Sequence, residues 1–95
     1  MSAYFIFTRE ATIDQAEMDL YSSTVQPTLV GHDVKILAAY GAHEDVEGPT
    51  NEGTIIVEFP TMEAAKAWYD SPAYTKVREH RFKGATYRAL LVAGV

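Results

Sequence analysis

The sequence predicts an α+β fold in which one four-stranded antiparallel sheet carries its helices on a single face. Strand-like and helical segments follow one another in the order β-α-β-β-α-β, which is the order of ferredoxin-like folds. The chain has 95 residues, enough for one hydrophobic core, so we expect a single domain over residues 1–95. Ser71-Pro72 interrupts the second helical segment, which predicts a helix in two parts.

The first half of the chain predicts a strand, a helix and a second strand. Residues Ala3 to Arg9 are rich in aromatic side chains and include a β-branched one, which favours a strand. Thr12-Ile13-Asp14-Gln15 matches a capping box, with threonine at the cap, so a helix should follow it. Pro27 should kink or end the regular part of this helix, and Gly31 should stop it. Val34 to Tyr40 then form the second strand.

An acidic loop and a third strand follow. Ala42 to Gly53 is rich in acidic residues, glycine and asparagine, which is typical of a solvated hairpin loop. Thr54 to Phe59 predicts the third strand. Pro60 cannot extend that strand, and Thr61 is a good helix cap. The second helical segment therefore begins at this point.

The last part of the chain predicts a broken helix and the fourth strand. Asp70 should end the first piece of the helix, and Ser71-Pro72 should begin the second, because proline at the first helical position loses no hydrogen bond. Gly84 should end that second piece, behind a run of basic residues. Thr86 to Ala93 predicts the last strand.

The predicted strands are apolar on both faces, which a single layer of helices cannot cover. In the first strand Tyr4 and Ile6 alternate with Phe5 and Phe7. Later strands repeat this pattern, in which Ile56 opposes Ile55, Val57 and Phe59, and Leu91 opposes Leu90 and Val92. Monomers rarely expose such patches, so we expect a homodimer that pairs through the sheet faces and buries at least ~1,500 Å² in total. The competing interpretation is a strand assignment that is wrong by one residue.

Composition excludes several classes of partner and site. The net charge is −5, which argues against a nucleic-acid backbone as partner. The chain has no cysteine, so disulfides and thiolate metal sites are excluded. It has no signal-peptide pattern and no apolar stretch near the ~20 residues that cross a bilayer, so we expect no membrane partner and a cytoplasmic protein.

The candidate site lies between the helices and the sheet, where this architecture leaves a cleft open at one end. We expect Trp68, Tyr69 and Tyr74 to wall this cleft as substrate-binding residues. Arg81 would offer a fixed cation to an anionic or enolic group, because it shares a helix face with Tyr74.

Each of these residues also has a structural interpretation. Trp68 and Tyr69 are large aromatics at a helix bend and can serve as core instead. Arg81 can point outward, or form a salt bridge with a carboxylate of the first helix such as Glu17 or Asp19.

Arg81, His80 and His32 are the candidates for a catalytic role. Histidine titrates near neutral pH, and a cofactor-free site would need a group that moves a proton at a carbonyl or enol. The histidines match no metal motif, and His32 and His43 flank the second strand at its opposite ends, so we expect no metal and no cofactor.

The chain resembles the proteins described as domain of unknown function 1330 (DUF1330). The resemblance covers nearly the whole chain and rests on Tyr21, Pro27, Glu47-Gly48, Glu58-Phe59-Pro60-Thr61-Met62-Glu63-Ala64-Ala65, Trp68-Tyr69, Ser71-Pro72, Tyr74, Arg81, Leu91-Val92 and Gly94-Val95. It implies the fold of the dimeric α/β-barrel superfamily, in which two ferredoxin-like domains pair. One departure is Gly31-His32-Asp33, where family members commonly carry a double glycine.

The resemblance implies a scaffold and a pocket, and it does not imply a reaction. The family has no agreed activity, while relatives in the superfamily include monooxygenases, isomerases, dechlorinating enzymes and proteins with no known chemistry. Two functions therefore stay open. One is a homodimeric binder or enzyme for a small organic molecule, working without a cofactor. The other is a non-catalytic dimeric module with a structural, stress-linked or regulatory role.

Overall fold

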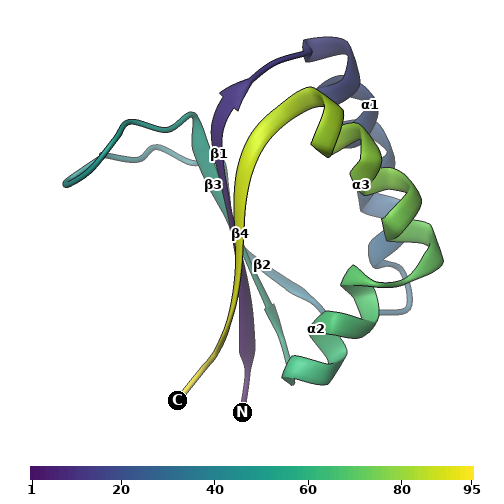
Figure 1. Ribbon diagram of the computed structural model, residues 1–95. Helices are drawn as coiled ribbons and strands as arrows, with labels where there is room; N and C mark the ends of the chain where they lie inside the picture. Colours follow the sequence, from purple (N-terminus) through teal and green to yellow (C-terminus); the bar gives the residue numbers. More distant parts are fainter.

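The computed structural model describes all 95 residues and places every helix on one face of a single sheet (Figure 1). In chain order the elements are β1 (Ala3–Thr12), α1 (Gln15–Val25), the 3-10 helix η1 (Gln26–Leu29), β2 (Lys35–Ala39), β3 (Gly53–Phe59), α2 (Met62–Tyr69), α3 (Pro72–Gly84) and β4 (Ala85–Ala93). The predicted α+β fold with a ferredoxin-like element order is confirmed. None of the helices has the length and apolar character that a membrane crossing requires.

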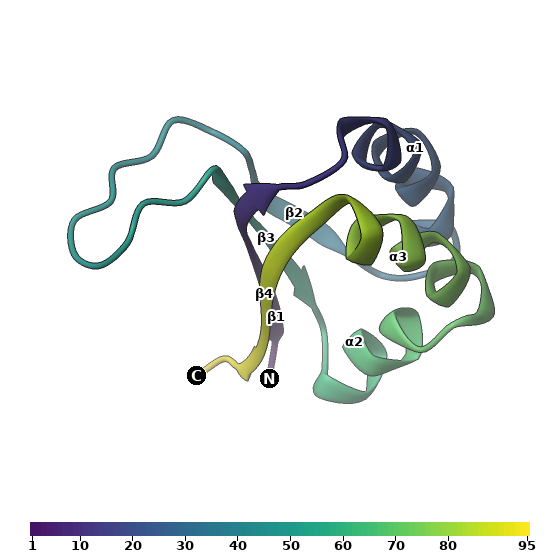
Figure 2. The same ribbon diagram turned by 45° about the horizontal axis from the view of Figure 1, so that its top comes forward.

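The sheet has the strand order β2-β3-β1-β4, and all neighbouring strands are antiparallel. The central strand β1 pairs with β3 on one side and with β4 on the other, so that Phe5 lies between Val57 and Leu91. Ala3 pairs with Ala93, which brings the two ends of the chain to the same edge of the molecule (Figure 2).

Local sequence signals set the bounds of α2 and α3 as predicted. The Thr61 hydroxyl accepts a hydrogen bond from the Ala64 backbone N–H at 3.0 Å and caps α2. The Ser71 hydroxyl accepts one from the Tyr74 N–H at 3.3 Å, and Pro72 is the first residue of α3. The predicted break in the second helical segment is therefore confirmed.

The predicted cap of the first helix at Thr12 is wrong. Asp14 caps α1, and its side chain accepts hydrogen bonds from the N–H groups of Ala16 and Glu17 at 3.1 and 3.4 Å. Thr12 instead ends β1, where it pairs with Ala85 of β4 after a register shift in the strand. A residue held in a strand ladder cannot begin a helix, so α1 starts two residues later than the local pattern indicates.

The Gly84 carbonyl ties the start of α1 to the end of α3. It accepts hydrogen bonds from the backbone N–H groups of Ile13 at 2.7 Å and Asp14 at 3.0 Å. A Cβ atom at Gly84 would lie 2.9 Å from the Cγ and Sδ atoms of Met18. The two helices therefore meet at a point where only glycine fits.

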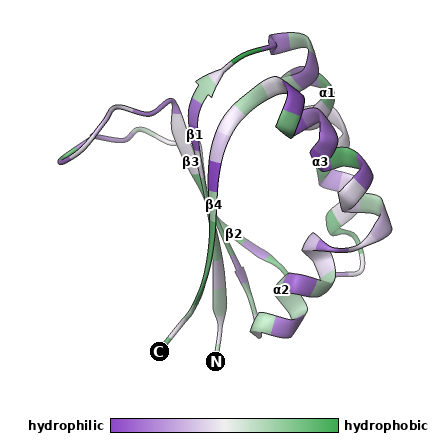
Figure 3. Ribbon diagram, in the orientation of Figure 1, coloured by the Kyte–Doolittle hydropathy of each residue, from purple (hydrophilic) through white to green (hydrophobic).

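The side chains of the sheet divide between a buried face and an open face. Phe5, Phe7 and Phe59 point toward the helices and join the hydrophobic core. On the other face Leu90 and Val92 of β4 remain 57% and 43% exposed. Figure 3 shows that β4 is hydrophobic toward its C-terminal end. All helices lie on one face of the sheet, so no helix covers the opposite face of β4. The predicted alternation of two apolar faces is confirmed.

Candidate functional site

A cavity of about 140 Å³ lies between the helix layer and the sheet, beside the edge strand β2. Nine of its ten lining residues are hydrophobic, and the exception is Gln26 of η1. Ile36 and Ala39 of β2 line it next to the sheet edge. An apolar cavity of roughly 150 Å³ accommodates a benzene molecule, so this volume suits one small ring.

Trp68 forms part of the cavity wall and is only 3% exposed. Its indole Nε1–H donates a hydrogen bond to the Thr28 hydroxyl at 3.1 Å. Its ring stacks on Phe59, with 5.7 Å between the ring centroids, and contacts Tyr74, with 4.0 Å between centroids. Trp68 is therefore both a core residue and a rigid wall of the cavity.

Tyr69, in contrast, does not line the cavity. Its ring stacks on Phe5 at a centroid distance of 5.3 Å. The guanidinium carbon of Arg78, a residue of α3, lies 4.3 Å from the centroid of the Tyr69 ring. The Arg78 Nη1–H also donates to the Tyr69 carbonyl at 3.2 Å. These contacts secure the bend between α2 and α3.

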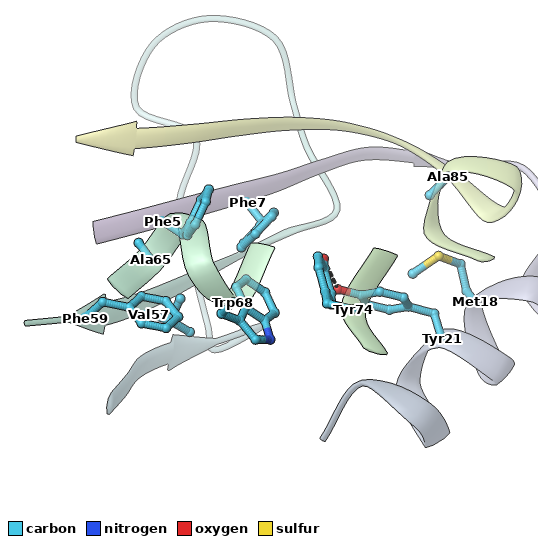
Figure 4. Packing of buried hydrophobic residues seen from close by; sticks show 10 residues of the cluster. All are labelled: Phe5, Phe7, Met18, Tyr21, Val57, Phe59, Ala65, Trp68, Tyr74 and Ala85. Atoms are coloured by element: carbon cyan, nitrogen blue, oxygen red, sulfur yellow. Dashed lines mark hydrogen bonds between the residues drawn. The ribbon is translucent and has the colours of Figure 1, made fainter. Parts of the chain in front are cut away.

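Tyr74 lies deeper, in a buried pair with Tyr21 of α1. The two hydroxyl groups are 2.8 Å apart, and Figure 4 shows them pointing at each other from opposite helices. Burial raises the pKa of Tyr21 above its ordinary value, and the neighbouring Tyr74 hydroxyl adds to the rise. Burial also raises the pKa of Tyr74, against the opposing charge of Arg81. Both phenols are therefore neutral at physiological pH.

Arg81 points inward and is only 3% exposed. Its guanidinium carbon lies between 5.1 and 5.2 Å from the ring centroids of Phe7, Phe82 and Tyr87. Its Nε and Nη2 atoms are buried without a hydrogen-bond partner. Arg81 is therefore a buried cation that aromatic faces surround and no anion neutralises.

The alternative expectation of a salt bridge from Arg81 to Glu17 or Asp19 is wrong. The Glu17 carboxylate instead binds His80, with 2.6 Å between Oε2 and Nδ1. The Asp19 carboxylate accepts a hydrogen bond from the side chain of Gln15, its neighbour one turn away. Arg81 is buried against the sheet, where it contacts Phe7 and Tyr87. The Glu17 carboxylate lies beside His80, and Asp19 is exposed to solvent.

The histidines do not line the cavity. His80 is occupied by its contact with Glu17 on the neighbouring helix. His32 follows η1, where its backbone N–H donates to the Leu29 carbonyl at 3.0 Å. No three histidine or acidic side chains lie close enough together to hold a metal ion.

A second tyrosine pair lies at the end of the sheet. The hydroxyls of Tyr40 and Tyr87 are hydrogen bonded to each other, and Arg9 stacks over the Tyr40 ring at 4.7 Å. Tyr40 adopts a φ of 55°, a left-handed conformation that a non-glycine residue occupies at a cost. Because the Tyr87 ring also contacts Arg81, we define Arg81, Tyr21, Tyr74, Tyr87 and Tyr40 as the tyrosine–arginine cluster.

Sequence reasoning found Arg81 and Tyr74 and missed the other members of this cluster. Tyr21 and Tyr74 are 53 positions apart, and Tyr40 and Tyr87 are 47 positions apart. No spacing rule connects residues at such separations. The strand register brings the second pair together. In it, Arg9 of β1 pairs with Tyr87 of β4 on one side and with Gly53 of β3 on the other.

A model of the family described as "Domain of unknown function (DUF1330)" matches residues 2–95. The chain belongs to the DUF1330 family. The expectation drawn from the residue pattern is therefore confirmed, and the family description assigns no activity. A comparison with curated proteins finds no match to this DUF1330 chain.

Solved structures share the fold of this DUF1330 domain at low sequence identity. The RPA0582 protein of unknown function from Rhodopseudomonas palustris is 14% identical, with a TM-score of 0.78 over 99% of this chain and 82% of that one. A dimeric ferredoxin-like protein of unknown function from Bacteroides fragilis is 9% identical, with a TM-score of 0.67 over 98% and 96%. SnoaB from Streptomyces nogalater, a cofactor-independent oxygenase, is 9% identical, with a TM-score of 0.64 over 99% and 93%. At these identities the likeness establishes the fold alone.

The cavity of this DUF1330 domain and the tyrosine–arginine cluster share a boundary. Phe7 lines the cavity and contacts the Arg81 guanidinium. Tyr21 lines the cavity with its ring and reaches the cluster with its hydroxyl. The cavity and the cluster therefore share Tyr21 and meet at Phe7, although Arg81 and Tyr74 are not themselves lining residues.

Proposed function

We propose that this protein is a homodimer that binds or converts a small organic molecule in the cavity between its helices and its sheet, without a cofactor. The observation that carries this proposal is the cavity of about 140 Å³ with its almost wholly apolar lining. Protein interiors are otherwise close-packed, and an apolar wall offers water few hydrogen-bond partners. Such a space favours an apolar ligand of matching size.

The proposed binding residues have different roles. Trp68 would contact the ligand directly, because its ring is part of the cavity wall. Tyr74 and Arg81 would act at the polar end, behind the rings of Phe7 and Tyr21. Tyr69 would act indirectly, by holding α2 in place through its contacts with Phe5.

Conversion of the ligand would use these same groups. A neutral tyrosine hydroxyl can donate a proton or a hydrogen bond to a carbonyl oxygen, and Arg81 can stabilise the charge of an enolate. His80 and His32 lie outside the cavity lining, so they have no part in this proposal. SnoaB, which has the same fold, is described as a cofactor-independent oxygenase, so the scaffold is compatible with chemistry that needs no cofactor.

The open face of the sheet supports the homodimer. It carries Tyr4, Ile6, Ile56, Leu90 and Val92 on strands without a helix above them. Solved structures with this fold from Bacteroides fragilis and Thermobifida fusca are described as dimeric. A second copy in an isologous arrangement would cover the apolar face with an identical one.

The contacts of two aromatic residues favour the second candidate function, a non-catalytic dimeric module with a structural, stress-linked or regulatory role. Trp68 has its indole N–H satisfied by Thr28, and Tyr69 is fixed by Arg78. Both side chains therefore have structural reasons to be present. A binding experiment separates the two functions, because only the first requires the cavity to accept a ligand.

The test combines native mass spectrometry of the purified protein with a thermal-shift screen of single-ring compounds. In the variant Ala39→Phe a large ring would fill the cavity next to β2. Ala67→Phe adds the same ring at an exposed position of α2, outside the cavity, and is the matched control. We expect a dimer that carries extra mass or is stabilised by a compound, and loss of this effect only in Ala39→Phe. No ligand effect in the parent protein, together with a higher melting temperature in Ala39→Phe, would favour the non-catalytic module.

A further inference from the structure

Arg81 is a buried cation that forms no ion pair within the chain. Its side chain is 97% removed from solvent, since only 3% of the residue is exposed. A buried charge is tolerated when it is paired and hydrogen bonded, and an unpaired one is strongly disfavoured. The rings of Phe7, Phe82 and Tyr87 supply cation–π contacts, which satisfy the charge only in part.

The chain itself provides no anion for Arg81. The ion pairs of the structure engage Glu10, Glu17, Asp45, Glu52 and Asp70, each with another partner. Tyr21 and Tyr74 are close to Arg81 but are neutral, because burial raises the pKa of both phenols. The missing anion must therefore come from outside the chain.

The unpartnered atoms of Arg81 indicate the shape of that anion. Nε and Nη2 are the two nitrogen atoms on one edge of a guanidinium group, and both lack a partner. Their N–H groups are parallel, and this is the edge that binds the two oxygen atoms of a carboxylate at the same time. A spherical anion or a single carbonyl oxygen would satisfy only one of them well.

The volume and the lining of the cavity determine the size and polarity of the remaining part of the ligand. Its volume of about 140 Å³ and its hydrophobic lining fit one ring, with no charged side chain in the lining to bind a second ionic group. Phe7 and Tyr21 line this space, and the Phe7 ring centroid also lies 5.2 Å from the Arg81 guanidinium carbon. The binding mode proposed below requires a rotation of the Tyr21 side chain, in which its hydroxyl exchanges the hydrogen bond to Tyr74 for one to the carboxylate.

We propose that the ligand is a single-ring monocarboxylic acid, with its ring in the cavity and its carboxylate on the Nε–Nη2 edge of Arg81 beside the hydroxyls of Tyr21 and Tyr74. This inference rests on the proposed function, since it assumes that the cavity is the binding site. It adds the class of ligand and the atoms that recognise it.

The test measures the binding of benzoate and of its uncharged counterpart toluene. NMR titration and calorimetry give the two affinities. We expect the parent protein to bind benzoate at least about tenfold more tightly than the Arg81→Met variant does, with toluene binding equal in the two proteins. Arg81→Lys keeps the charge and loses the parallel N–H pair, so it should also weaken benzoate binding. Arg81→Met removes an unpaired buried charge, and its melting temperature without ligand should be equal to or above that of the parent.

The possible outcomes distinguish a failure of this inference from a failure of the proposed function. Binding of toluene without benzoate, or benzoate binding that Arg81→Met leaves unchanged, would overturn the monocarboxylate inference and leave the cavity as a ligand site. Binding of neither probe to the parent would overturn both. If Arg81→Met does not fold, the comparison of the parent with Arg81→Lys decides, and equal benzoate affinity in those two proteins would overturn the inference.

Discussion

The hydroxyl groups of Tyr21 and Tyr74 meet at 2.8 Å in the space between α1 and α3, and they join two helices that are far apart in the chain. Each hydroxyl is buried, so each depends on the other for a hydrogen bond that solvent would otherwise supply. Tyr21 also lines the cavity, whereas Tyr74 does not. Tyr21 therefore contributes to the stability of the fold and also to the proposed ligand site.

Tyr21→Phe should lower the free energy of unfolding by about 1–3 kcal/mol, because it leaves the Tyr74 hydroxyl buried without its partner. Urea denaturation monitored by circular dichroism measures the change. Tyr69→Phe is the control, since the Tyr69 hydroxyl makes no hydrogen bond within the protein and its removal should be nearly neutral. Equal losses in the two variants would contradict this account of the pair.

Gly84→Ala should destabilise the fold by about 1–3 kcal/mol, as over-packing of a tight contact does. The added Cβ would lie 2.9 Å from the Met18 side chain and 3.0 Å from the Met18 backbone nitrogen, and the backbone cannot easily move. Gly41→Ala is the matched control, because nothing lies within 4 Å of the new atom. Thermal melts of both variants test the prediction, and an unchanged melting temperature for Gly84→Ala would refute the close helix contact.

Asp14→Ala should lower the stability by about 0.5–2 kcal/mol through the loss of the cap of α1. Asp14→Ser should retain most of it, since a serine hydroxyl can accept the same hydrogen bonds from the first turn. Chemical denaturation of the two variants gives the comparison. A serine variant as unstable as the alanine variant would show that the side chain acts in another way.

Leu90→Glu should shift the protein from dimer to monomer, because it places a charge on the open apolar face of the sheet. Val30→Glu introduces the same charge at a residue that is 81% exposed after η1, and it should leave the assembly unchanged. Sedimentation velocity at micromolar concentration distinguishes the species. A dimer that survives Leu90→Glu would require a different interface.

Glu52 should make the stability depend on pH in the acidic range. Hydrogen bonds from Thr12, and then the charge of Arg9, hold the pKa of Glu52 below its ordinary value in the folded protein. Its contribution is therefore present above the unfolded pKa and is lost as the pH falls through the folded pKa. Glu52→Gln should melt below the parent at pH 7, and the difference should shrink as the pH falls through the lowered pKa of Glu52 in the folded protein. Glu44→Gln, an exposed loop control, should show no such difference.

The fold was predictable because its signals are local. The caps at Thr61 and Ser71, the prolines next to them in the sequence, and the two apolar faces of β1 each lie within a few residues of the feature that they determine. The start of α1 was not predictable in this way. Pairing of Thr12 with Ala85 extends β1 past its apparent end, and a pairing across the sheet leaves no mark near Thr12.

The candidate site was only partly predictable for the same reason. Trp68, Tyr74 and Arg81 share one helical segment of sequence, so they could be considered together. The direction of Arg81 depends on the ring of Phe7 beneath it and on Tyr21 from another helix. Contacts of that kind follow from the packing of α1 and α3 against the sheet, which spacing along the chain does not encode.

The alternation along β1 gives the domain an unusual pattern of mutational tolerance. Phe5 and Phe7 belong to the core, and Phe7 also lines the cavity, while Tyr4 and Ile6 lie on the open face, so a substitution at one position alters one surface and spares the other. Evolution can therefore change the cavity face and the open face of this strand independently, one residue at a time. Insertion or deletion of a single residue in β1 would exchange the two sets at once. Homologues should accordingly diverge freely in the identity of these side chains and hardly at all in the length of this strand.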